Sequence, residues 1–129
     1  IADYFEHEIG YHIPPMTPFV GRYFNMTRAG IHADGLMKNP EIYNIFDTES
    51  ILNRPPKVSI TGTSGTAGIV FWLNHSYSRR GEKEYTKKDP LVAKLYEWVT
   101  DQFDNGRITM ISDAEMEEQI ATLCKAQDL

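Results

Sequence analysis

One histidine in the sequence lies in a setting that suits acid–base chemistry. His32 lies within residues 30–35, GIHADG, and the flanking glycines would let the backbone approach another surface closely. A histidine held in such a place changes its protonation near neutral pH, so it can act as a general acid or base. His32 is therefore a candidate catalytic residue.

A tyrosine follows this histidine at a distance that a bend in the chain could bridge. Tyr43 lies eleven residues after His32, about three turns along a continuous helix. Pro40 lies between them and favours a bend, which could bring the two rings to one site. The alternative is that both side chains only pack, or that they point apart.

A short turn between an expected strand and an expected helix is a second candidate site. The turn is 62–65, GTSG, and the helix is expected over 66–74. N–H groups in the first turn of a helix can hold an anion, so Ser64 and Gly65 are candidate contacts for a substrate or cofactor. The spacing alone favours the alternative, a tight turn in which Ser64 caps the helix.

The composition argues against several other kinds of site. No two of the four histidines are three or four residues apart, and Cys124 is the single cysteine, so neither a metal site nor an internal disulfide is expected. The net charge is −5 with no dense basic stripe, which argues against a nucleic-acid partner. No apolar run is long enough to span a membrane, and one cysteine is compatible with a reducing, cytoplasmic setting.

Helix signals predict a mainly α-helical chain. A helix that ends near Ile9 leads into a proline-rich linker, and another helix is expected over 30–38. The best-marked helices begin at Asp89-Pro90, with Asp89 as the N-cap, and at the capping box Ser112–Glu115. Apolar residues recur through both at helical spacing and are expected to form core rather than cofactor contacts: Trp98, Phe103, Met116 and Leu123.

Two short β-prone stretches interrupt the helices. Residues 23–26 and 58–60 are expected to pair as a two-stranded antiparallel element, because a lone strand would leave its backbone groups unpaired. The chain is thus expected to form small helical subdomains with this β element. The expected divisions are the end of a helix with the linker, a helical subdomain, and a C-terminal helical pair: 1–17, 18–78 and 79–129.

A long ordered set of residues is recognisable as a family pattern. It comprises Ile13-Pro14-Pro15, then Pro18-Phe19-Val20-Gly21, then Phe24, and then residues 29–43, AGIHADGLMKNPEIY. This set, which spans about residues 9–69, resembles the 2-isopropylmalate synthase and homocitrate synthase family. The resemblance implies that the chain follows a metal-binding TIM barrel, as the end of the barrel's last helix plus helical subdomains.

The resemblance also implies a reaction for the full-length enzyme. Members of the family are acyltransferases that condense acetyl-CoA with a 2-oxo acid, with a divalent metal (Mg²⁺, Mn²⁺ or Zn²⁺) in the barrel. His32 matches the family's Gly-Ile-His histidine, and Tyr43 matches a tyrosine of homocitrate synthases. In the family these residues reach the active site of the neighbouring subunit. The expected partners are therefore the barrel and a second copy of the chain, and the segment alone is expected to be inactive and to bind no metal.

Some positions depart from the family, and several interpretations stay open. Many members have a histidine at Thr27, a lysine at Gly62 and a basic residue at Thr66, which argues against an anion or CoA contact at the turn. The resemblance favours an enzyme like 2-isopropylmalate synthase, as in leucine biosynthesis, and the alternative is a homocitrate- or citrate-forming synthase of the same family. The alternatives to an enzyme segment are a non-catalytic helical dimerisation or regulatory module and a small-ligand sensor with a pocket at Ser64. Tyr4, Phe5 and Phe19 are expected to be exposed where the barrel or a second subunit would contact them.

Overall fold

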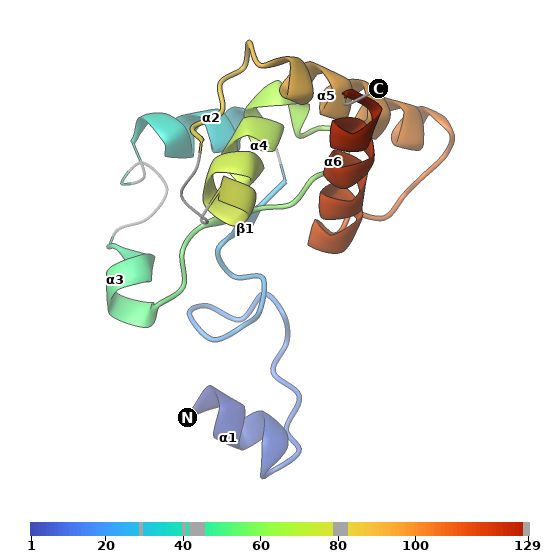
Figure 1. Ribbon diagram of the computed structural model, residues 1–129. Helices are drawn as coiled ribbons and strands as arrows, with labels where there is room; N and C mark the ends of the chain where they lie inside the picture. The colour runs from blue at the N-terminus through green and yellow to red at the C-terminus, as the bar shows by residue number, and fades with distance from the viewer. Residues whose placement is uncertain (29, 40, 42–45, 79–82, 128–129) are drawn as a thin grey trace.

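The chain is mainly helical, as expected from its sequence. The computed structural model describes residues 1–28, 30–39, 41, 46–78 and 83–127. Its helices are α1 (Ala2–His7), α2 (Gly30–Lys38), α3 (Thr48–Leu52), α4 (Gly65–Trp72), the π-helical η2 (Leu73–Tyr77), α5 (Pro90–Asp104) and α6 (Asp113–Gln127). Figure 1 shows α2, α4, α5 and α6 gathered together, with α1 apart from them. Among the described residues, no helix has the length and apolar character that crossing a membrane requires.

The two short strands run parallel, so the expected antiparallel element is wrong. Strand β1 (Met26–Thr27) pairs with β2 (Lys57–Val58), with Met26 opposite Lys57 and Thr27 opposite Val58. Parallel strands need a long crossover, and the residues between these strands, which include α2 and α3, provide it. An antiparallel pairing does occur further along the chain, where Ile60 forms an isolated bridge with Ile111.

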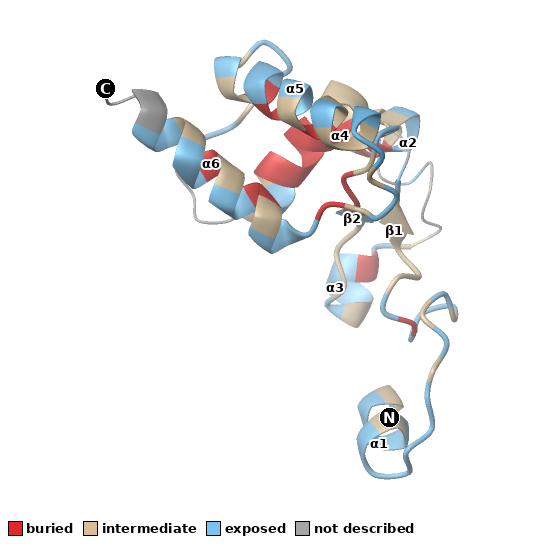
Figure 2. Ribbon diagram, turned by 90° about the vertical axis from the view of Figure 1, so that its right-hand side faces the viewer, coloured by how far each residue is buried: buried red, intermediate tan, exposed pale blue. Residues whose placement is uncertain are grey.

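This topology places the starts of two helices at one edge. α2 follows β1 and α4 follows β2, so both helices begin beyond the carboxyl ends of parallel strands. The two helices pack against each other and lie side by side in Figures 1 and 2. A small cluster of buried side chains joins them: Ala33, Leu36, Val58 and Phe71.

The main core lies between α4, α5 and α6. Its fully buried members include Ile69, Leu95 and Met116, and Figure 2 shows how strongly burial is concentrated on α4. Met116 was an expected core residue. The three other expected core residues are partly buried and pack against this cluster: Trp98, Phe103 and Leu123.

The expected helix starts are present, with one difference. At α6 the capping box forms, because the Ser112 N–H donates to Glu115 Oε2 at 2.8 Å and the Glu115 N–H donates to Ser112 Oγ at 3.3 Å. At α5, Asp89 occupies the N-cap position and Pro90 follows it, but the carboxylate accepts no bond from the helix. It accepts instead from the N–H and the hydroxyl of Thr86, at 2.7 and 3.1 Å.

The N-terminal segment carries apolar side chains outside the core. α1 buries none of its residues, and Tyr4, Phe5 and Phe19 are 60%, 44% and 50% exposed, as expected. Arg54 binds the loop that contains Phe19 and Gly21, because its guanidinium donates to the carbonyl oxygens of these two residues at 2.9 and 2.7 Å. The segment therefore presents an apolar surface that the helical core does not cover.

Removing a side chain from the main core should destabilise the chain strongly. Leu95 is 0% exposed on α5, so Leu95→Ala deletes buried apolar atoms and leaves a cavity. We expect the free energy of unfolding in urea to fall by about 2–5 kcal/mol. Lys94→Ala, at the exposed neighbouring position, is the control and should change it by less than about 0.5 kcal/mol. Equal effects in the two variants would contradict the packing of α5.

An ion pair should make the start of α6 sensitive to acid. Both oxygens of Glu115 accept bonds from the Arg107 guanidinium, at 2.7 and 2.8 Å. Arg107 first, and then the N–H and hydroxyl of Ser112, lower the pKa of Glu115 from 4.5 to about 2. Because the pKa is lowered in the folded state, this contribution is complete above the ordinary pKa and is lost as the pH falls toward 2.

We therefore expect the urea midpoint to fall between about pH 6 and about pH 3, and to fall less in Glu115→Gln. Glu117→Gln, which alters an exposed carboxylate on the same helix, is the matched control and should follow the wild type. If Glu115→Gln lost as much stability as the wild type over this range, the pair would have no part in the acid sensitivity.

Candidate functional site

His32 lies in the first turn of α2, on the part of the helix that the core leaves uncovered. It is the third residue of the helix and is exposed, whereas its neighbour Ala33 is buried against α4. Leu36, one turn further along, is also buried. The helix thus packs against α4 through Ala33 and Leu36, and the side chain of His32 lies on the exposed side.

Ser64 lies immediately before α4, and its hydroxyl is used inside the chain. The residue is 1% exposed. Its Oγ accepts from the Thr61 N–H at 2.9 Å and lies 2.9 Å from the Ser59 carbonyl oxygen and 3.1 Å from the Arg28 carbonyl oxygen. Ser64 occupies the N-cap position of α4, as one of the two interpretations of the sequence predicted. Its side chain, however, forms no hydrogen bond with the N–H groups at the start of the helix. Gly65 follows with a φ of +59°, a conformation that favours glycine.

The structure brings the His32 segment and the Ser64 turn into direct contact. The Gly30 N–H donates to the Thr63 carbonyl oxygen at 3.1 Å. Gly30 also lies so close to Ser64 that an added Cβ would collide with the Ser64 carbonyl oxygen. The close approach expected from the glycine is therefore made to another part of the same chain. The sequence presented the His32 segment and the Ser64 turn as two separate candidate sites. The crossover between β1 and β2 brings them together where α2 and α4 begin, and we call this place the corner between α2 and α4.

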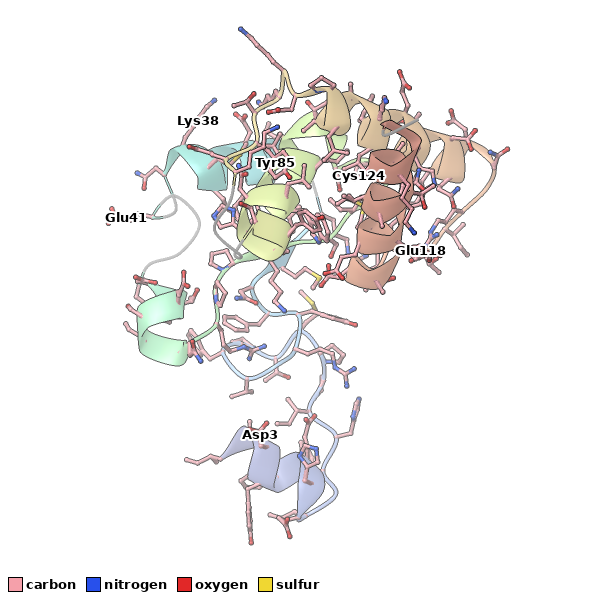
Figure 3. The ribbon with its side chains drawn as sticks, viewed as in Figure 1. Asp3, Lys38, Glu41, Tyr85, Glu118 and Cys124 are labelled. Carbon is pink, nitrogen blue, oxygen red and sulfur yellow. The ribbon has the colours of Figure 1, made fainter. Side chains whose placement is uncertain are left out.

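Ion pairs of Asp34, in the middle of α2, stabilise the second half of this helix. Asp34 pairs with Lys38 at 2.6 Å and with Lys87 at 2.5 Å, and Figure 3 shows Lys38 at the end of the helix. The bond to Lys38 first, and then that to Lys87, lower the pKa of Asp34 to about 2. Asp34 is therefore a carboxylate at neutral pH, and it links α2 to the segment before α5.

A pocket of about 720 Å³ lies at the other end of the α2–α4 pair. Leu36 and Phe71 line it, and the His75 ring stacks on the Phe71 ring with centroids 4.0 Å apart. Acidic residues from α3 and its approaches also line it: Glu41, Asp47 and Glu49. Neither His32 nor Ser64 is among its lining residues. This pocket was not expected from the sequence. The four-residue spacing of Phe71 and His75, which puts two rings on the same side of a helix, was the feature that could have indicated it.

Comparison with known proteins places this chain in a family. No family model matches it. Proteins named citrate (Re)-synthase, from Syntrophus aciditrophicus (strain SB) and Clostridium kluyveri, are 48% and 49% identical over 120 and 117 residues, or 93% and 91% of this chain. A 2-isopropylmalate synthase from Buchnera aphidicola subsp. Uroleucon sonchi is 33% identical over 84 residues, or 65% of the chain. Over most of its length the chain therefore matches a segment of enzymes in the 2-isopropylmalate synthase and homocitrate synthase family.

The similarity is broad along this chain but covers a small part of each relative. The chain spans 19% and 26% of the length of the two citrate synthases and 15% of the Buchnera protein. Because the citrate synthases match at least 91% of the chain, the similarity extends into the C-terminal helices, where the sequence showed no family signature. Most of each family member therefore lies outside the segment that this chain matches.

Two further expectations for the family site concern Tyr43 and a metal. Tyr43 lies outside the described residues, so its placement beside His32 stays a prediction. Within the described part of the chain, no three or more His, Cys, Asp or Glu side chains are grouped so that they could hold a metal ion. The donor set of this segment therefore does not fit the divalent metal that the family implies.

Proposed function

We propose that this chain is part of an enzyme that forms citrate from acetyl-CoA and oxaloacetate. The observation that carries the proposal is the 48–49% identity to citrate (Re)-synthases over more than nine-tenths of the chain, against 33% over 65% for the 2-isopropylmalate synthase. Citrate has the carbon skeleton of oxaloacetate extended by an acetyl unit, so this product fits an acetyl-CoA condensation. Of the three products that the sequence left open, citrate has the most support.

In this proposal the segment supplies an acid–base residue to a site completed by other parts of the enzyme. His32 is exposed in the first turn of a helix that is anchored on its opposite side, so it can enter a neighbouring surface without unfolding. The TIM barrel, which would hold the substrates and the metal, and a second subunit of a homodimer are proposed from the family resemblance. Since the described residues contain no group of three or more potential metal ligands, no step assigned to this segment involves the metal.

The reaction needs proton transfers that an imidazole can serve. The acetyl methyl carbon loses a proton to a base and bonds to the ketone carbon, and the ketone oxygen takes up a proton to become the hydroxyl of citrate. Water then cleaves the thioester and releases CoA. We assign His32 to one of these transfers, because an imidazole nitrogen can accept a proton and give it up again. Tyr43, through its hydroxyl, is proposed to position a water or steady a developing charge.

A cytoplasmic location is part of the same proposal. Cys124 is an exposed free thiol on α6, as Figure 3 shows, and a reducing compartment keeps such a thiol from oxidising. The acidic net charge of −5 and the absence of a basic stripe support small-molecule metabolism rather than nucleic-acid binding.

Substrate choice in the full-length enzyme tests the proposal. Release of CoA thiol would be measured with acetyl-CoA and oxaloacetate, 2-oxoglutarate or 3-methyl-2-oxobutanoate. We expect kcat/KM for oxaloacetate to exceed the other two by about 100-fold or more. 3-Methyl-2-oxobutanoate lacks the second carboxylate that the site would pair, and 2-oxoglutarate carries it one methylene further from the ketone. The 129-residue chain alone should release no thiol. A preference for 3-methyl-2-oxobutanoate would make the enzyme a 2-isopropylmalate synthase, and turnover by the segment alone would contradict the composite site.

A further inference from the structure

The Ser64 hydroxyl is fully engaged at the corner where α2 and α4 begin. It accepts from the Thr61 N–H and lies within 3.1 Å of two carbonyl oxygens, those of Ser59 and Arg28. The Thr61 hydroxyl lies 3.4 Å away. A hydroxyl has one donor and two acceptor positions, so each of these positions has a partner within the chain. Because the residue is also 1% exposed, its side chain has no room for a ligand contact.

The same bonds determine where α2 starts. Arg28, whose carbonyl oxygen contacts the Ser64 hydroxyl, lies two residues before Gly30, the first residue of α2. The Gly30 N–H is bound to the Thr63 carbonyl oxygen, and Gly30 is packed against the Ser64 backbone without space for a Cβ. The turn that contains Ser64 therefore holds α2 immediately before and at its first residue. His32 is two residues further on in the same helical turn, so a shift of this attachment would move its backbone.

We propose that Ser64 is a positioning residue for His32 rather than a contact for substrate or cofactor. The inference rests on the proposed function, since it takes His32 to be the acid–base residue of the condensation. Without the hydroxyl, the Arg28 carbonyl oxygen loses its shortest contact with the turn and keeps only those with the Thr61 and Thr63 hydroxyls at 3.4 and 3.5 Å, so the first turn of α2 can shift. An imidazole displaced by about 1 Å transfers protons poorly, whereas substrates held by the barrel bind as before. The expected signature is a lower kcat at an unchanged KM.

One serine and one threonine substitution in the full-length enzyme distinguish this role of Ser64 from a general effect on kcat of altering the turn. Ser64→Ala removes the buried hydroxyl, and Thr63→Ala, the matched control, removes an exposed hydroxyl one residue earlier. We expect Ser64→Ala to lower kcat by about 10- to 100-fold and to leave both KM values within about twofold. Thr63→Ala should keep kcat within about twofold of the wild type. The Thr63 hydroxyl lies 3.5 Å from the Arg28 carbonyl oxygen, which is beyond an ordinary O–H···O bond, and its other partner is the Thr61 hydroxyl at 3.1 Å. Its removal leaves the 3.1 Å contact between Ser64 and Arg28 in place.

A double variant shows whether Ser64 acts through His32. If it does, His32→Ala combined with Ser64→Ala should be no more than about twofold slower than His32→Ala alone, because the positioned group is already gone. A fold-decrease in kcat of the double variant equal to the product of the decreases in the two single variants would overturn the inference. So would an unchanged kcat in Ser64→Ala, an equal loss in Thr63→Ala, or a raised KM for acetyl-CoA with kcat intact, which would make Ser64 a substrate contact.

A replacement variant covers the case in which Ser64→Ala does not fold, and a comparison with His32→Ala separates this inference from the proposed function. If Ser64→Ala does not fold, Ser64→Cys replaces it, since cysteine keeps the shape of the side chain and a weak donor. That variant should show the same fall in kcat at unchanged KM, of smaller size, and an unaltered kcat would overturn the inference. Full activity of His32→Ala refutes the proposed function of His32 itself, whereas a slow His32→Ala together with a normal Ser64→Ala refutes only the positioning role.

Discussion

His32→Ala in the full-length enzyme should lower kcat by about 10²- to 10⁴-fold, the loss that follows removal of a positioned acid or base. The fold should stay intact, because the side chain is exposed and α2 is held by Gly30, Ala33 and Leu36. Steady-state rates of CoA release measure the first effect, and urea unfolding measures the second.

Two comparisons make the His32 result interpretable. Tyr43→Phe should slow turnover less than His32→Ala, because a hydroxyl that positions a water is easier to replace than the proton carrier itself. Ile31→Ala alters an exposed neighbour in the same helical turn and should keep kcat within about threefold of the wild type. If His32→Ala were as active as Ile31→Ala, His32 would have no catalytic role, and the interpretation of this segment as a packing module would be preferred.

Mixing two inactive variants should restore activity if the site is shared between subunits. One partner would carry His32→Ala, and the other would carry a substitution at a metal ligand of the barrel. In a random mixture half of the dimers contain one chain of each kind, and each such dimer has one intact composite site of two. We therefore expect about a quarter of wild-type activity, compared with almost none for either variant alone.

Each variant mixed with itself is the control for this experiment. Formation of mixed dimers would be verified with two different affinity tags, because a lack of exchange would hide the effect. If mixed dimers form and show no recovery, His32 serves the active site of its own subunit, and the proposed action across the subunit boundary is wrong.

The local elements were predictable because their signals lie within a few residues. Ser112 and Glu115 satisfy each other's backbone groups across one turn, and Asp47 accepts from the N–H groups of Glu49 and Ser50 at the start of α3. In both cases the residues that form the cap lie within three positions of each other in the sequence. Similarly, Gly30 indicated a close approach, since the absence of a Cβ is a property of that single residue.

What the sequence did not show depends on contacts between distant residues. The direction of the strands is set by the crossover that contains α2, and the β-prone stretches carry no information about it. The partner of Gly30 and the bonding of Ser64 are also distant, because Arg28 and Ser64 are 36 residues apart. A serine before a helix usually caps it, and here the tertiary contact prevails over that local preference.

The corner between α2 and α4 has a consequence for how this segment can tolerate change. Ser64 bonds the main-chain atoms of Arg28, Ser59 and Thr61, and every amino acid type except proline supplies the same atoms. Replacements at such partner positions leave these bonds in place, whereas Gly30 and Ser64 contribute features that other residue types lack. Residue type therefore matters in this corner at Gly30 and Ser64, and at Gly65 because of its positive φ, whereas the positions that contribute only main-chain atoms tolerate other side chains. Gly62 and Thr66 can accordingly differ from the residues common in the family while the Ser64-Gly65 pair between them is retained.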